Sequence, residues 1–126
     1  MDAGRFVSRV LDDEGLTDGL NDPEARMLIE WVVAEVEHIA EELDAEPAAW
    51  REVESLCRRV RGIRRFVSLW CHRQDHSAAL QLVGAERFAW PLPPADELDP
   101  CQIMEQILNW ELSHRRGTSI AESWDR

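Results

Sequence analysis

Lysine and tyrosine are absent from this chain of 126 residues, and cysteine, glycine and proline are scarce. Three cysteines, none of them in a C-x-x-C pair, are too few and too widely spaced for a disulfide framework, which favours a reducing compartment. Six Gly and six Pro exclude a collagen-like or low-complexity polymer. No apolar run is long enough to span a membrane, and no basic start precedes an apolar block at the N-terminus. We therefore expect a cytoplasmic protein without a membrane segment.

Sequence motifs for catalysis are missing as well. The chain contains no glycine-rich phosphate loop, no nucleophile elbow and no cluster of cysteines. We therefore predict no catalytic activity. The length is near the commonest domain size, and a hydrophobic content of 44% is enough for a modest core, so we expect one helical domain over residues 1–126.

Charge is unevenly distributed along the chain, whose net charge is −11. Residues 1–55 contain 16 acidic residues and 4 Arg, whereas residues 56–88 contain 7 Arg and 2 acidic residues. Residues 89–126 are acidic again, with 7 acids and 3 Arg. Every basic residue is thus an arginine, whose planar guanidinium can bind a carboxylate or a phosphate through two parallel hydrogen bonds.

Two segments show the apolar spacing of packed helices. From residue 25 to 43, and again from 49 to 70, apolar residues recur at alternating steps of three and four. The connection at 44–47 is so short that only antiparallel neighbours fit it. We predict an all-α small helical bundle built on a long antiparallel hairpin of helices over about 23–45 and 48–71. The residues expected in its core include Val32, Val36, Ile39, Val53, Val60 and Ile63.

The rest of the chain is less regular, and no segment shows the alternation of apolar and polar residues that is typical of a strand. Two interpretations of residues 72–88 stay open: the long helix runs on to Val83, or it breaks near Asp75. The other expected elements are a short N-terminal helix (about 3–14), a Pro-rich connection (89–99), a C-terminal helix (about 100–116) and a flexible tail (117–126).

Arginines gather on the outer face of the second hairpin helix, opposite its apolar seam. This face can bind an acidic protein partner or the phosphates of a nucleic acid, although the net charge opposes general nucleic-acid affinity. Alternatively, the arginines pair within the molecule with acids of the first hairpin helix, namely Glu37, Glu41, Glu42 and Asp44. The candidate partner-binding residues are Arg58, Arg59, Arg61 and Arg65, with Arg64 to one side.

Two tryptophans are further candidates for partner binding. Trp31 lies at the edge of its helix seam, and Trp90 directly precedes the Pro-rich connection. Tryptophan at such boundaries is enriched in protein–protein interfaces, but a small domain also uses bulky rings to complete its core. Both interpretations stay open for both residues.

Histidine and glutamate spacing suggests metal binding as an alternative. Of two E-x-x-H motifs, the one at 35–38 directs its histidine to solvent, whereas Glu111 and His114 lie on the final helix. His72 and His76 have the spacing with which one helix can offer two imidazoles to zinc. The structural alternative is that His114 is partly exposed at a helix end and that Glu111 pairs with a nearby arginine.

Taken together, these patterns favour a small acidic helical module for protein–protein interaction or regulation. It would bind a protein partner or another copy of itself, with no cofactor and no membrane contact. One alternative is a nucleic-acid-associated subunit that uses the arginine face. The other is a helical bundle that binds zinc or iron through Glu111, His114, His72 and His76.

Overall fold

The fold is known from a computed structural model that describes residues 3–12, 15–42 and 46–124. These residues form five α-helices and one π-helical turn, with no strand among them, so the all-α prediction is confirmed. No helix in this part of the chain is both long and apolar enough to cross a membrane. The elements are α1 (Ala3–Leu11), α2 (Asp22–Glu42), α3 (Glu46–Val67), the π-helical turn η1 (Ser68–His72), α4 (His76–Glu86) and α5 (Pro100–Trp124).

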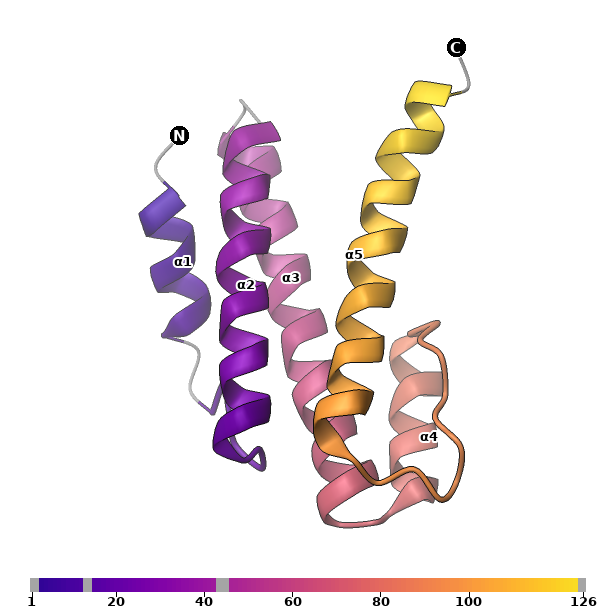
Figure 1. Cartoon of the computed structure of the whole chain (residues 1–126). Helices are drawn as coiled ribbons and strands as arrows, with labels where there is room; N and C mark the ends of the chain where they lie inside the picture. The colour runs from indigo at the N-terminus through magenta and orange to yellow at the C-terminus, as the bar shows by residue number, and fades with distance from the viewer. Residues whose placement is uncertain (1–2, 13–14, 43–45, 125–126) are drawn as a thin grey trace.

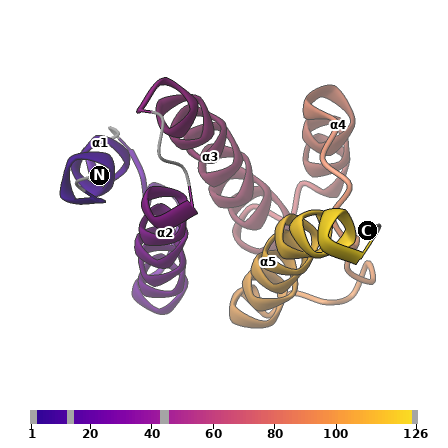
Figure 2. The same ribbon diagram turned by 90° about the horizontal axis from the view of Figure 1, so that it is seen from above.

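Helix α3 is the central element of the bundle. It contacts α1, α2, α4 and α5, and α2 in turn contacts α1 and α5. Helices α2 and α3 lie side by side and run in opposite directions (Figure 1). Seen from above, α2 and α5 lie on one side of the bundle, and α3 and α4 lie on the other (Figure 2). The face of α3 that turns away from α2 is therefore flanked by α4 and α5.

The core follows the apolar seams that the sequence predicts. Each of the six seam residues is at most 5% exposed, because all of them face the neighbouring helices. These residues are Val32, Val36, Ile39, Val53, Val60 and Ile63. The stripe of α5 that enters the core is Ile103, Met104, Ile107 and Leu108.

Several helix boundaries differ from the prediction. Helix α3 begins at Glu46 because Pro47 stands in its first turn, where the missing N–H of proline removes no helical hydrogen bond. Helix α5 was expected to end at 116, yet it continues to Trp124, since one glycine weakens a helix without breaking it. The flexibility expected for 117–126 stays a prediction. Helix α1 ends at Leu11, earlier than the expected end near residue 14, and the expected end of the second helix, at residue 45, lies outside the described residues.

The long helix breaks near Asp75, which was one of the two alternatives. The chain widens into η1, where the N–H of Arg73 donates to the carbonyl of Ser68 over 2.9 Å. Gln74 then takes a left-handed conformation, with φ of 54°. A side-chain oxygen of Asp75 accepts from the N–H of Ala78 over 3.0 Å and caps the new helix. The break redirects the chain into α4.

Both helix starts that contain an Asx-Pro pair are capped by side chains. The carboxylate of Glu24 accepts from the N–H of Asn21 over 3.2 Å, as in a capping box. Oδ1 of Asp99 accepts from the N–H groups of Cys101 and Gln102 over 3.0 Å and 3.4 Å. These contacts fix the points at which α2 and α5 begin.

Arg87 ends α4 in a left-handed conformation, with φ of 59°, a position that glycine usually fills. The N–H of Arg87 donates to Gly84 and that of Phe88 to Val83, as in a Schellman motif. We expect Arg87→Gly to raise the free energy of unfolding by about 0.5–1 kcal/mol, since it removes a steric penalty of about 1–2 kcal/mol while adding some entropy to the unfolded chain. Urea unfolding measures the change. Arg87→Ala is the control and should give no gain, and a loss of stability in Arg87→Gly would contradict the argument.

Candidate binding cleft

The arginine face of α3 lies on the surface, as predicted. Arg58, Arg61 and Arg65 are exposed, and Arg59 and Arg64 are half-buried. Val60 and Ile63, on the opposite face of the same turns, are buried. This separation follows from the helical period of 3.6 residues.

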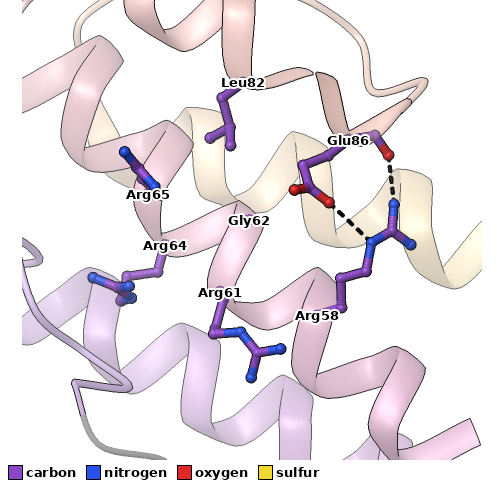
Figure 3. Close-up of a pocket in the computed structure, with 7 residues that line it drawn as sticks. All are labelled: Arg58, Arg61, Gly62, Arg64, Arg65, Leu82 and Glu86. Atoms are coloured by element: carbon purple, nitrogen blue, oxygen red, sulfur yellow. Dashed lines mark hydrogen bonds and ion pairs between the residues drawn. The ribbon is translucent and has the colours of Figure 1, made fainter. Parts of the chain in front are cut away.

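A hollow of about 370 Å³ lies between this face and α4. It is bounded by Arg58, Arg61, Gly62, Arg64, Arg65, Leu82 and Glu86 (Figure 3). A second hollow, of about 350 Å³, continues past the end of α3 toward the turn at residues 15–19. It is bounded by Asp18, Gly19, Arg64, Arg65, Ser68, Leu69 and Arg73.

The two hollows share Arg64 and Arg65, and we refer to them together as the arginine cleft. Five arginines line the arginine cleft, against two acidic residues. In a chain with net charge −11, this surface has the opposite sign from the average. Which of the five arginines can bind a ligand depends on their partners within the molecule.

Arg58 is committed to an internal contact. Its Nε donates to the carboxylate of Glu86 over 3.0 Å, and a second nitrogen donates to the backbone carbonyl of the same residue (Figure 3). The guanidinium also lies over the ring of Phe88, 5.1 Å from its centroid. Arg58 therefore shapes one wall of the cleft, and its charge is largely compensated.

Arg59 points into the molecule. Its guanidinium lies 3.5 Å from Glu111, and the two side chains are only 18% and 6% exposed. The indole N–H of Trp90 donates to the other oxygen of Glu111 over 3.2 Å. The expectation that Glu111 pairs with an arginine is confirmed. Because Arg59 is engaged in this buried pair, it does not contribute to the exposed arginine face.

Internal pairing is present for Arg58 and Arg59, and their acids differ from those we named. Arg58 and Arg59 pair with Glu86 of α4 and Glu111 of α5, because these two helices flank the outer face of α3. The acids named from the sequence were Glu37, Glu41 and Glu42, which belong to α2, and Asp44, which lies outside the described residues.

Three arginines of the cleft have no carboxylate partner within the described part of the chain. Arg65 and Arg73 are exposed, and no ion pair or side-chain hydrogen bond to a described residue holds either one. Arg64 donates from Nη1 to the backbone carbonyl of Asp18 over 3.2 Å, and its Nε is buried without an acceptor. The carboxylate of Asp18 turns back toward Gly15 of its own turn.

The structure separates the two tryptophan candidates. Trp90 is 4% exposed and stacks on Phe88 at 4.0 Å between ring centroids, so it belongs to the core. Gly62 permits this packing, because a Cβ there would overlap the ring of Phe88. Trp31 is half-buried on a shallow groove between α2 and α5, and its indole nitrogen has no partner among the described residues.

The helix break divides His72 and His76, the pair that was considered as an alternative zinc site. His72 lies at the end of η1, where its Nε2 is 2.7 Å from Glu24, a carboxylate only 3% exposed. His76 opens α4 and stacks on Trp70 at 4.1 Å between ring centroids. Two histidines four residues apart converge on one metal only when a continuous helix holds them, and here the helix is interrupted between them.

Glu111 and His114 also lie in different environments. Glu111 is 5% exposed on the core face of α5, whereas His114 is exposed, as expected. The His114 ring stacks on Trp110 at 3.8 Å, and its Nδ1 lies 2.9 Å from the backbone carbonyl of that residue. The helix does not end there, contrary to our expectation. Across the described residues, no three His, Cys, Asp or Glu side chains are grouped so that they could hold a metal ion.

Two of the three cysteines, Cys71 and Cys101, ionise less readily than a free thiol. Burial raises the pKa of the Cys71 thiol to about 12, and the negative charges of Glu24, Asp99 and Glu97 add to the effect. The pKa of Cys101 is raised as well, again chiefly by burial. Because the thiolate is the nucleophile, neither side chain is reactive near neutral pH.

Sequence reasoning found four of the cleft's arginines and missed its other members, among them Ser68 and Arg73. Both lie at the junction between α3 and α4, where the seam pattern ends and no longer indicates which way a side chain points. The density of arginine between residues 56 and 88 was the signal available for Arg73.

Comparison of the chain with models of known protein families, with curated proteins and with solved structures gave no match.

Proposed function

We propose that this protein is a protein–protein interaction module without catalytic activity, whose arginine cleft binds an acidic segment of a partner protein. The observation that carries the proposal is the grouping of Arg64, Arg65 and Arg73 in one cleft without a carboxylate partner among the described residues. Acidic residues outnumber basic ones by 25 to 14 in this chain, so a cleft lined mainly by arginines has the opposite charge from the chain as a whole.

Electrostatics supports a short acidic segment as the ligand. Guanidinium–carboxylate pairs are charge-assisted, and opposite potentials speed association and select against wrong partners. A long polyanion such as a nucleic acid would extend beyond the cleft across a protein of net charge −11, where like charges repel. A short segment can engage the cleft and avoid most of that repulsion.

The proposal is tested with a short fluorescent peptide of Asp and Glu and a fluorescent single-stranded oligonucleotide of equal length. We expect the peptide to raise its fluorescence anisotropy on binding and to bind more weakly as salt is added, because the contact is ionic. Tighter binding of the oligonucleotide than of the peptide would overturn the proposal in favour of nucleic acid. Failure of both probes to bind would overturn it entirely.

Charge reversal in the cleft should abolish most of this binding. We expect Arg65→Glu with Arg73→Glu to weaken peptide binding at least about tenfold, since a loss of roughly 1.4 kcal/mol suffices. Each exposed substitution should change the free energy of unfolding by no more than about 0.5 kcal/mol, as urea unfolding would show. Arg58 is left intact because it holds Glu86.

The matched control is Arg26→Glu with Arg51→Glu. Both residues are exposed and lie outside the cleft, and the double substitution changes the net charge by the same amount. We expect it to change the peptide affinity far less. Equal losses in both double variants would show that the peptide senses only the net charge, which contradicts a specific cleft.

A further inference from the structure

We infer that the end of the arginine cleft formed by Arg64, Arg65, Ser68 and Arg73 is a binding site for a phosphate monoester on a phosphorylated side chain of the partner segment. This inference rests on the proposed function and names the group that the cleft recognises. The site lies between the turn at residues 15–19 and the junction of α3 with η1.

The local charge at this end of the cleft favours an anion with more than one negative charge. Three arginines line a space of about 350 Å³, and the carboxylate of the one acidic residue that lines it lies beside Gly15 and forms no ion pair with them. That residue, Asp18, offers only its backbone carbonyl to Arg64. Such a concentration of positive charge is most stable around a compact anion that carries more than one negative charge.

Arg64 is held in place by the protein itself. Its guanidinium is anchored at Nη1, while its Nε is buried without an acceptor in the described residues. The acceptor at Nη1 is a backbone carbonyl without net charge, so the positive charge of Arg64 is left to attract an anion in the cleft. The anchored side chain is also partly ordered before the ligand arrives, which lowers the entropy lost on binding.

The number of donors at the site favours a phosphate over a carboxylate. A phosphorylated serine or threonine carries nearly two negative charges at neutral pH and three terminal oxygens, enough for several arginines at once. A carboxylate has one charge and two oxygens, which a single guanidinium can satisfy. The hydroxyl of Ser68 adds a donor that suits a further phosphate oxygen.

The wall of the site depends on Gly19. This residue has φ of 79°, and a Cβ at its position would overlap the hydroxyl of Ser68. Glycine thus lets the turn approach Ser68 closely and keeps its hydroxyl at the edge of the cleft.

The experiment uses two fluorescent acidic peptides that are identical except for serine or phosphoserine at one central position. We expect the phosphopeptide to bind the full chain at least about tenfold more tightly, which corresponds to one strong charge-assisted contact. Inorganic phosphate added as a competitor should reduce this preference while displacing the unphosphorylated peptide little.

Arg73→Gln tests the location of the site, because Arg73 borders only this end of the cleft. We expect it to remove most of the phosphopeptide preference and to leave the affinity for the unphosphorylated peptide within about threefold, since one rim charge adds little. Arg51→Gln is the matched control and should keep the preference. Circular dichroism of both variants confirms that the helices are intact.

The possible outcomes distinguish binding of an acidic segment from recognition of a phosphate. If neither peptide binds, the proposed function is overturned, and this inference with it. If both peptides bind equally, the inference is overturned while the proposed function stands. A preference that survives in Arg73→Gln would also overturn the inference, because the phosphate would then sit elsewhere. Tighter binding to vesicles that contain phosphatidic acid than to the phosphopeptide would overturn it in favour of a lipid headgroup.

Discussion

Replacing Phe66 with alanine is expected to lower the free energy of unfolding by about 3–5 kcal/mol. Phe66 is fully buried, with its ring centroid 5.6 Å from that of Trp70 and 5.9 Å from that of Trp90. Alanine would leave a cavity between two large rings that are themselves held by hydrogen bonds, to Glu97 and Glu111, and cannot easily close it. Urea unfolding followed by tryptophan fluorescence measures the loss.

Phe66→Leu is the matched control for this prediction. It keeps most of the buried volume, so we expect a loss of no more than about 1.5 kcal/mol. Leu92→Ala removes an exposed side chain, 53% accessible, and should change stability by less than about 0.5 kcal/mol. A loss below about 1 kcal/mol in Phe66→Ala would contradict the central place of these rings in the core.

The helical core was predictable from sequence because its information is local. Val32 and Val36, or Val60 and Ile63, reveal their common face through spacing of three and four alone. Side chains with that spacing must be buried together if the segment is a helix, whatever its neighbours are. The fold class and the burial of these residues therefore followed from the sequence.

The fate of the individual arginines was not predictable, because it depends on contacts between distant segments. Arg58 and Arg59 are adjacent on one helix, yet their acids come from α4 and α5, about 28 and 52 residues further along the chain. Helical periodicity indicates which way a residue points but not which helix will stand opposite. For the same reason, the sequence could not decide whether Trp90 lies in the core or at an interface. Its packing depends on Gly62, which belongs to a distant segment of the chain.

For His72 and His76, the local spacing itself was misleading. The spacing of His72 and His76 implies a shared face only if the helix is continuous, and the π-helical turn with Gln74 interrupts it. No residue between 68 and 75 is a proline or a glycine, so the usual signals of a break are absent. The polar residues at 72–76 indicated that a break was possible without deciding it.

Removing the positive charge of Arg59 is expected to destabilise the protein by about 3 kcal/mol, the lower end of the range for breaking a buried ion pair. In Arg59→Ala, Glu111 would stay buried without its cation, while the indole N–H of Trp90 would still donate to its carboxylate. The lower end applies because Arg59 retains some contact with solvent. The neighbouring Arg58→Ala should cost no more than about 1 kcal/mol, since the Arg58–Glu86 pair is nearly half exposed on both sides. Urea unfolding at neutral pH compares the two variants.

A second substitution separates the charge from the packing. In the Arg59→Ala background, Glu111→Gln removes the uncompensated charge but keeps an oxygen that can accept from Trp90. If the buried charge is the cause of the loss, the double variant is more stable than Arg59→Ala alone, and the two effects are strongly non-additive. If the losses simply add, the ion pair contributes nothing as a pair, and the destabilisation comes from the lost packing of the arginine side chain against the core.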